Sequence, residues 1–180
     1  MNLLFIVMGI IEILFAIFLS FLTFIIGFKF LSIFTVNYND EQEIKSKNTA
    51  VGILSATFLI CIGLLLKEAA IPTVSIIKNT VLLSAGFVSV MISLGYIAIH
   101  LVLTLTISIL SLFLSIILVT KLSPFKNLDP VKNNNIAFTL VLAATMLVTA
   151  MFIAEPLVTF LSGIIPQGID HIPAPTGLLK

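Results

Sequence analysis

Hydrophobic and polar residues follow each other along this chain in long blocks, not in short periods. The apolar blocks reach from the start of the chain to Phe34, from Asn48 to Glu68, from Thr80 to Val119 and from about Asn135 to Ala154. About 20 apolar residues in a helix cross the roughly 30 Å hydrocarbon core of a bilayer. The pattern therefore predicts an all-α, multi-pass transmembrane protein with four spanning helices.

The first apolar block is about 30 residues long, or about 45 Å as a helix, so we expect this helix to tilt or to protrude. No basic residue precedes it, and no clear cleavage site follows it before the polar loop. These two features favour a retained membrane helix over a secretory signal.

The first polar loop contains a start signal for the second helix. Asp40 and Glu43 have the spacing of a capping box. Asn48 and Glu68 are about 30 Å apart along a helix, which is the length of one full crossing. We therefore expect Asn48 at one interface of the membrane and Glu68 at the other.

The second polar loop contains an equivalent signal for the fourth helix. Asp129 can accept hydrogen bonds from free amide groups, and Pro130 suits a first helical position. This helix is expected to run to about Ala154 and to end at Glu155 and Pro156.

The block between these two helices is about twice as long as one crossing, and His100 is its only histidine, lysine, aspartate or glutamate. Glycine and serine concentrate in its first half. We assign Ile71 to about Gly95 to an extra apolar segment that is interfacial, half-inserted or protruding. The third spanning helix is then expected from about Tyr96 to Thr120.

One polar-to-apolar frame occurs twice, at an offset of 87 residues. Lys45, Asn48, Ala50, Ala56 and Glu68 recur as Lys132, Asn135, Ala137, Ala143 and Glu155. We interpret this as a duplication in which each unit is a helix, a cytoplasmic loop and a helix. Two such units side by side are parallel repeats, related by a pseudo-twofold axis along the membrane normal.

The duplication divides the chain into a first membrane repeat (1–68), the extra apolar segment (69–95), a second repeat (96–155) and an extracytoplasmic tail (156–180). In each repeat the second helix contains two small residues seven positions apart, which lie on one helix face. Small residues let membrane helices approach closely. We therefore expect the second and fourth helices to pack through Ala56, Gly63, Ala143 and Ala150.

The lysines indicate an orientation, because cytoplasmic loops of membrane proteins are rich in lysine and arginine. One side of the predicted membrane has Lys29, Lys45, Lys47, Lys121, Lys126 and Lys132, and the other has Lys67, Lys78 and Lys180. Both polar loops are therefore expected in the cytoplasm and both termini outside it.

The composition excludes several classes of protein. With 59% hydrophobic and 9% charged residues, the chain cannot cover a soluble domain with polar surface, so the lipid bilayer is its expected partner. A net charge of +1 gives no basic surface for nucleic acid. Cys61 has no second thiol with which to form a disulfide. The adjacent Asp170 and His171 are too few for a metal site, and we expect neither a metal nor a cofactor.

The segment from Asp40 to Ala50 and its counterpart from Asp129 to Ala137 resemble the signature of the small YjfL-like inner-membrane proteins of bacteria, the DUF350 family. This resemblance implies a four-helix protein of two tandem repeats in the bacterial inner membrane, without an established activity. It also implies an association with membrane-stress proteins.

Four ionisable residues are candidates for an ion pathway. Glu12 lies within the first helix, where an unpaired carboxylate is unfavourable, and it is expected at nearly the depth of His100. The two side chains either meet, within or between subunits, or have separate structural roles. Glu68 and Glu155 either form an acidic ring in an oligomer or mark the ends of their helices. For Asn48 and Asn135 we expect hydrogen bonds between helices.

No phosphate loop, zinc motif or convergent set of catalytic side chains is present in the sequence. The sequence therefore favours a non-enzymatic membrane protein that self-associates into a homo-oligomer, in membrane maintenance or stress response. The alternative hypothesis is a channel or transporter for a small cation or a proton, using the candidate ion-pathway residues.

Overall fold

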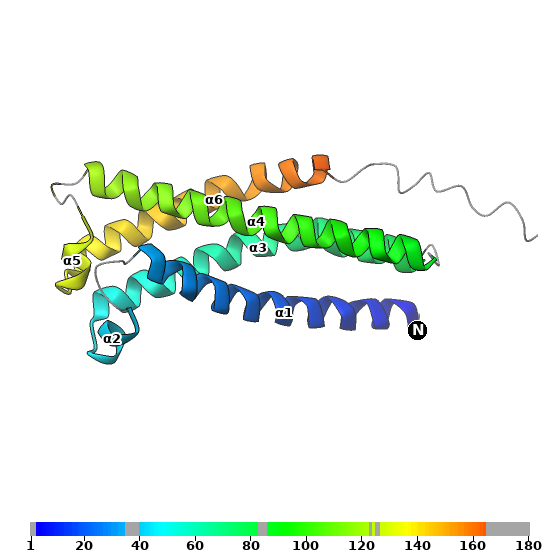
Figure 1. Ribbon diagram of the computed structural model, residues 1–180, viewed down its shortest axis with the longest axis horizontal. Coiled ribbons are helices and arrows are strands. Elements are labelled where there is room, and N and C mark those ends of the chain that lie inside the picture. The colour runs from blue at the N-terminus through cyan, green and yellow to red at the C-terminus, as the bar shows by residue number, and fades with distance from the viewer. Residues whose placement is uncertain (1–2, 35–39, 83–85, 123, 125–126, 165–180) are drawn as a thin grey trace, which may run out of the picture.

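The computed structural model describes residues 3–34, 40–82, 86–122, 124 and 127–164 (Figure 1). These residues form helices and their connections, and no strand occurs among them. The helices are α1 (Leu3–Phe34), α2 (Asp40–Lys45), α3 (Thr49–Leu82), α4 (Phe87–Leu122), α5 (Asp129–Lys132) and α6 (Ile136–Ile164).

Four of these helices, α1, α3, α4 and α6, are long and apolar enough to cross a membrane. They run alternately in opposite directions, and the short helices α2 and α5 lie together at one end of the molecule (Figure 1). The predicted all-α fold with four spanning helices is confirmed. Both polar loops lie at the same end, which is the arrangement that parallel units require.

From the sequence, α2 and α5 were not predicted as separate helices, but as the starts of the long helices that follow. The start signal at Asp40 opens α2, and the signal at Asp129 opens α5, but neither continues into the following long helix. The spanning helices α3 and α6 begin only at Thr49 and Ile136. Each polar loop is therefore a helical turn followed by a sharp change of direction.

The helix α3 is the centre of the bundle. It packs against α1, α4 and α6, and its contact with α6 is the most extensive in the molecule. In its most apolar stretch 56% of the residues are buried, against 6% in α1. The core along α3 contains Val51, Leu54, Phe58, Ile62 and Leu65, with Leu112, Leu142, Met146 and Leu161 from the neighbouring helices.

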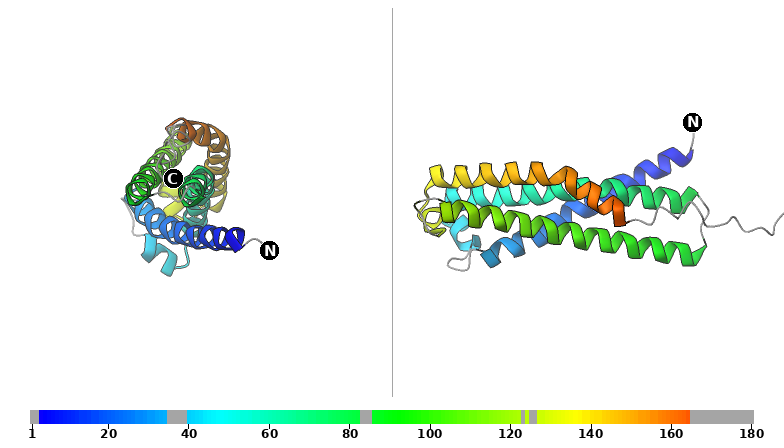
Figure 2. Two further views of the ribbon diagram at one scale, coloured as in Figure 1. Left: turned by 90° about the vertical axis from the view of Figure 1, so that its right-hand side faces the viewer. Right: turned by 90° about the horizontal axis from the view of Figure 1, so that it is seen from above.

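The helix α1 lies at the periphery and packs on α3 alone to any large extent. Leu19, Gly27 and Leu31 are its buried residues. At Gly27 the side chain of Leu59 packs against the backbone of α1, because a Cβ atom added there would lie 2.7 Å from Cδ2 of Leu59. The N-terminal part of α1 leads away from the other helices (Figure 2).

The assignment of residues 71–95 to a segment separate from its neighbours needs correction. Residues 71–82 continue α3 through Pro72, and residues 87–95 are the first turns of α4. The two helices are 34 and 36 residues long, or about 50 Å, and residues 71–82 and 87–95 are their ends far from α2 and α5. Its glycines and serines do not break α4, and the third spanning helix begins at Phe87, not Tyr96.

The expectation that Glu155 and Pro156 end the last helix is wrong. The helix α6 includes Pro156 and continues to Ile164. Proline removes one backbone hydrogen bond and bends a helix. The end of α6 accordingly turns toward α4 (Figure 2). The tail from residue 165, with Asp170, His171 and Lys180, lies outside the described residues.

The predicted packing of small residues between α3 and α6 is half wrong. Ala143 and Ala150 of α6 are buried, as expected. Ala56 of α3 is exposed, and Gly63 faces α1, because a Cβ added to Gly63 would lie 3.7 Å from Cγ2 of Thr23. The helices α3 and α6 do pack together, but larger side chains of α3 fill that interface.

Candidate functional site

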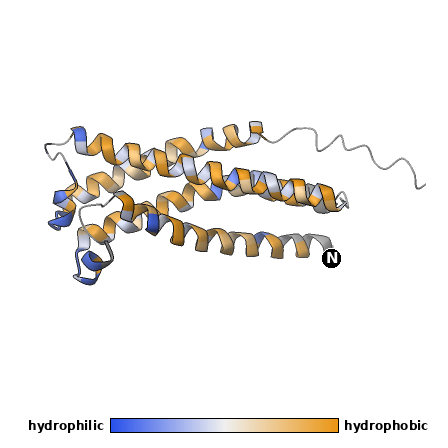
Figure 3. Cartoon of the chain, viewed as in Figure 1, coloured by the Kyte–Doolittle hydropathy of each residue, from blue (hydrophilic) through white to orange (hydrophobic). Residues whose placement is uncertain are grey.

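Polar side chains gather where α2 and α5 lie (Figure 3). We call this end the junction. Lys29, Lys45, Lys47, Lys121 and Lys132 are exposed there or in the adjoining helix turns, whereas Lys126 lies outside the described residues. The junction is therefore the most hydrophilic part of the described chain, and its geometry is set by three asparagines.

Asn48 is buried and connects the two polar loops. Its Oδ1 accepts a hydrogen bond from the backbone N–H of Val51 (3.2 Å) and so caps the N-terminus of α3. Its Nδ2 donates to the carbonyl of Lys132 (2.8 Å), to that of Val131 (3.4 Å) and to Oε2 of Glu43 (3.1 Å). One side chain thus closes a helix end and binds the end of α5.

Two further asparagines complete this arrangement. Oδ1 of Asn134 accepts from the backbone N–H of Ala50 (3.0 Å), so the second loop supplies another cap to α3. Asn135 caps α6 by accepting from the N–H of Phe138 (3.0 Å). We call Asn48, Asn134 and Asn135 the asparagine clasp. Asn48 makes the expected hydrogen bonds to another helix, α5, whereas Asn135 caps its own helix, α6.

The backbone of the two loops is nearly identical. Five hydrogen bonds of the first loop recur in the second at an offset of 87 residues, each within 0.2 Å. In the first loop these bonds are Ser46 N to Gln42 O, Lys47 N to Ile44 O, Asn48 N to Glu43 O, Gly52 N to Asn48 O and Val51 N to Asn48 Oδ1. In the second loop the corresponding bonds, in the same order, are Asn133 N to Asp129 O, Asn134 N to Val131 O, Asn135 N to Pro130 O, Thr139 N to Asn135 O and Phe138 N to Asn135 Oδ1.

The sixth shared feature is a backbone angle: Lys47 and Asn134, also 87 residues apart, have φ of 64° and 57°. These are the non-glycine residues with positive φ among those described. The two loops therefore share both their hydrogen bonds and their unusual backbone conformation.

The left-handed conformation suits the two residues unequally. Asparagine tolerates it, whereas for lysine it is unfavourable by about 1 to 2 kcal/mol. We expect Lys47→Gly to raise the free energy of unfolding by about 0.5 to 1 kcal/mol, after the extra freedom of glycine in the unfolded chain is subtracted. Asn134→Gly should instead lower it by about 1 kcal/mol, because the bond to Ala50 is lost. Thermal unfolding of both variants in one detergent measures these changes, and equal signs would contradict the assignment.

A second polar feature runs along the inside of α4. Ser93, His100, Thr104, Ser108 and Ser115 are all buried and lie within an arc of about 80° on the helix. Ser115 Oγ donates to Thr149 Oγ1 of α6 (2.7 Å), so this face of α4 meets α6 there. We call these five residues the polar row. Because hydroxyl groups bond well within a bilayer, the bond between Ser115 and Thr149 helps to hold α4 against α6.

His100 is fully enclosed, with 0% of its surface exposed, as are Thr104 and Ser108 of the polar row. Neither ring nitrogen has a hydrogen-bond partner among the described residues. The backbone of Leu161, in the last turn of α6, comes near the imidazole without completing a hydrogen bond. Thr104 Oγ1 donates to the carbonyl of His100 (2.7 Å) and not to its ring.

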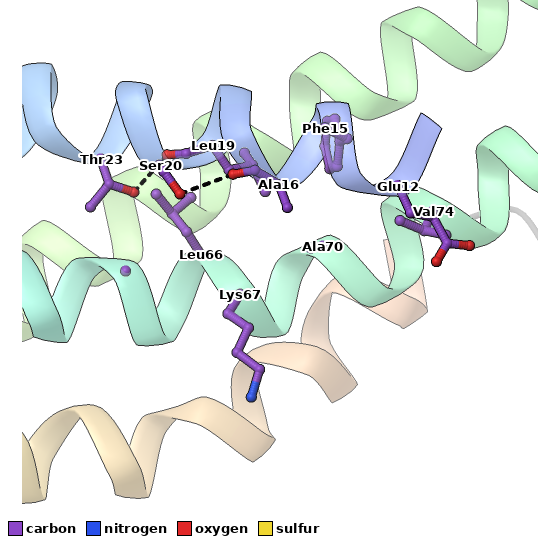
Figure 4. Close-up of a pocket in the computed structure, with 11 residues that line it drawn as sticks. Glu12, Phe15, Ala16, Leu19, Ser20, Thr23, Leu66, Lys67, Ala70 and Val74 are labelled. Carbon is purple, nitrogen blue, oxygen red and sulfur yellow. Dashed lines mark hydrogen bonds between the residues drawn. The ribbon is translucent and has the colours of Figure 1, made fainter. Parts of the chain in front are cut away.

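Glu12 lies in a groove between α1 and α3, away from His100. The groove has a volume of about 380 Å³ and is lined mainly by apolar side chains, with Lys67 as its second charged residue (Figure 4). Ser20 and Thr23 also line it, but their hydroxyls donate to carbonyls of α1. The structure does not join Glu12 to His100 within one chain, because the imidazole has no partner.

The other two candidate glutamates do not converge with these residues. Glu68 is half-buried on α3, and Glu155 is exposed on α6. No group of three or more histidine, cysteine, aspartate or glutamate side chains suitable for a metal occurs in the described part of the chain. Cys61 is buried as a free thiol. The four ion-pathway candidates therefore do not gather into one such group within the described residues.

Two functional features were missed by reasoning from the sequence. Asn134 has no counterpart in the first loop, where Lys47 takes its place, so the duplication alone drew no attention to it. The polar row was hidden because serine and threonine are common in membrane helices. Their spacing of seven, four, four and seven residues along α4 was the signal that could have revealed a shared face.

The fold and the junction define a multi-pass helical membrane protein. A family model described as Domain of Unknown Function (DUF350) matches residues 5–104, which is more than half of the chain. The chain therefore belongs to the DUF350 family. The match includes Asn48 and His100 and ends before the second loop. No curated protein and no solved structure matches the chain.

Proposed function

We propose that this protein is a non-enzymatic component of the bacterial cytoplasmic membrane that self-associates into a homo-oligomer through the far ends of its helices. Its role would be in membrane maintenance or stress response, as the family resemblance implies. The observation that carries the proposal is a set of exposed apolar side chains at the far end of α4. The ionisable residues of the four long helices indicate where these side chains lie relative to the bilayer.

Ionisable residues delimit a layer of the width of a bilayer core. Glu12, Glu68, His100 and Glu155 each lie 19 to 22 residues from the junction end of their helix. This corresponds to about 28 to 33 Å, close to the roughly 30 Å of hydrocarbon in a membrane. We infer that the bilayer core lies between the junction and these four residues, with the lysine-rich junction in the cytoplasm.

The helices then extend about 14 to 21 Å beyond this layer. Tilting alone does not bring helices of about 50 Å within the core, since it would need an angle far above the usual 20° or so. Phe87 and Val88 at the start of α4 are 76% and 69% exposed. We call these two residues with Met91, Ile92 and Leu94 the apolar tip.

Apolar side chains outside the hydrocarbon core are unfavourable in water, and a large exposed patch of them marks an interaction surface. A second copy of the chain brings a matching apolar tip at the same height above the membrane. Copies that share one bilayer and one orientation meet side by side, which is the geometry of a closed cyclic oligomer. Self-association through the apolar tip therefore accounts for its exposure.

Cysteine cross-linking tests this proposal. In a Cys61→Ser background, Val88→Cys is expected to give cross-linked dimers and larger species in native membranes, because this residue would lie at the interface. Leu110→Cys is the matched control, since Leu110 is 60% exposed on the same helix but lies within the inferred hydrocarbon core. Gel electrophoresis of both variants gives the readout. Equal cross-linking at the two positions, or none at Val88, would remove the apolar tip as the interface.

We also infer that the two loops with their long helices are copies of one ancestral unit. The support is the five recurring hydrogen bonds and the two matching left-handed residues at the same offset. Three or more of the four ionisable candidates do not gather in the described part of the chain, which disfavours the cation-pathway hypothesis for a single subunit.

A further inference from the structure

The groove between α1 and α3 is a space of the size that ligands occupy. Its volume of about 380 Å³ lies within the range of about 300 to 1,000 Å³ that is usual for ligand sites. Apolar side chains form most of its walls, among them Phe15, Leu19 and Leu66. Because α1 lies at the periphery and packs on α3 alone to any large extent, a lipid molecule can enter the groove from the side.

Two close contacts fix which residues of α1 and α3 lie at the same level. A Cβ atom added to Gly63 would meet Thr23, and one added to Gly27 would meet Leu59. The residue numbers in these two pairs have the same sum, as is expected of two helices that run in opposite directions. The level of any other residue of the groove follows from this register.

Glu12 and Lys67 are the two charged residues of the groove, and they lie at different depths. Glu12 is level with Val74, beside which it lies in Figure 4, and Lys67 is level with Leu19. Seven residues of α3, from Lys67 to Val74, separate the two levels, which is about 10 Å along the helix axis. The groove therefore has a positive charge nearer the junction and a negative charge farther from it.

This order of charges is complementary to a zwitterionic phospholipid headgroup. Lys67 adjoins Glu68, which marks the edge of the proposed hydrocarbon core, and Glu12 lies beyond Lys67. In a phospholipid the phosphate lies next to the glycerol and the acyl chains, and the amine of the headgroup lies farther out. Lys67 is thus at the depth of a phosphate, and Glu12 is at the depth of an amine.

The pair of charges also distinguishes between headgroups. Phosphatidylglycerol has a phosphate for Lys67, but it brings no positive charge to the carboxylate of Glu12. Phosphatidylcholine has both charges, but its quaternary ammonium has no N–H to donate. Phosphatidylethanolamine has a primary ammonium, which donates the strong hydrogen bonds that join two charged groups.

We propose that the groove binds phosphatidylethanolamine from the leaflet farther from the junction. The lipid ammonium donates to the carboxylate of Glu12, and the glycerol and first methylenes cover the apolar walls. In Figure 4 the ammonium of Lys67 is directed away from α1, and its flexible four-carbon stem lets it swing to a phosphate at the mouth of the groove. The bound lipid fastens the N-terminal half of α1 to α3. The inference rests on the proposed position of the bilayer, but not on self-association.

Native mass spectrometry of the purified protein tests the choice of lipid. The protein in a mild detergent is titrated separately with phosphatidylethanolamine, phosphatidylglycerol and phosphatidylcholine of the same acyl chains. We expect phosphatidylethanolamine to bind at least about threefold more tightly than either of the other two lipids. Equal binding of the three lipids, or a preference for phosphatidylglycerol, would overturn the proposal.

Three variants test the location of the site. Glu12→Gln should abolish the preference over phosphatidylglycerol, and Lys67→Gln should weaken the binding of both lipids. Glu155→Gln is the matched control, because Glu155 is exposed on α6 and does not line the groove, and it should bind as the parent does. The same loss in Glu12→Gln and Glu155→Gln would contradict the assignment.

Ala70→Phe fills the groove and leaves both charges in place, so it should also reduce binding of phosphatidylethanolamine. Unchanged binding in this variant would exclude the groove as the site. The result with Glu12→Gln does not depend on whether Ala70→Phe folds, since glutamine keeps the shape of the side chain. Cross-linking at Val88 does not involve the groove, so a failure of self-association would leave the lipid measurement unaffected.

Discussion

Replacing Asn48 with aspartate is expected to lower the free energy of unfolding by about 2 to 4 kcal/mol. The carboxylate can still cap α3 through Val51, but it cannot donate. It would face the carbonyls of Val131 and Lys132 and the carboxylate of Glu43, all of which now accept from the amide. Reversible unfolding in mixed micelles measures the change.

Asn135→Asp is the matched control for this variant. Asn135 has the equivalent capping bond to Phe138, and aspartate keeps it. We expect a change of less than about 1 kcal/mol. If both substitutions had the same effect, the donor bonds of Asn48 between the two loops would contribute nothing, and the asparagine clasp would be only a pair of helix caps.

Gly27→Leu is expected to separate α1 from α3 and to lower the free energy of unfolding by about 1 to 3 kcal/mol. Even a Cβ atom at this position comes within 2.7 Å of Cδ2 of Leu59, so a leucine side chain must displace Leu59 from its place against α1. Cross-linking between Thr23→Cys and Gly63→Cys, in a Cys61→Ser background, reports the contact, since these positions adjoin across the two helices. The cross-link should form in the parent and be lost in the Leu variant.

Gly9→Leu provides the control on the same helix. A Cβ atom at Gly9 would meet nothing within 4 Å, so the larger side chain should leave both stability and the cross-link unchanged. Retention of the cross-link in Gly27→Leu would show that α1 is held at other points, and the close approach at Gly27 would then have little importance.

The sequence predicted the junction ends of the helices well because strong local signals lie there. Asn48 and Asn135 are good N-caps, and lysines separate them from the preceding apolar blocks. The far ends were predicted poorly for the opposite reason. The turn between α3 and α4 lies inside a continuous apolar block, and Pro72 and Pro156 are tolerated within helices, so neither composition nor proline marks the true boundary.

The candidate site could be predicted only in part. The roles of Asn48 and Asn135 follow from their place at a helix start, which is a local property. The burial of His100 and the bond from Ala50 to Asn134 depend on which helix faces which, and a periodic apolar helix does not reveal its neighbours. For the same reason Gly63 was assigned to the wrong partner, since small residues lie on several faces of α3.

The bonds from Ala50 to Asn134 and from Asn48 to Lys132 join residues more than 80 positions apart in the chain. During biosynthesis, the ribosome must therefore make the second loop before these two hydrogen bonds at the N-terminus of α3 can form. Until then, the first hairpin would lie in the translocon or the surrounding lipid without the bonds from Asn48 to Lys132 and from Ala50 to Asn134. Membrane insertion of the two hairpins and completion of the tertiary structure are thus coupled in time.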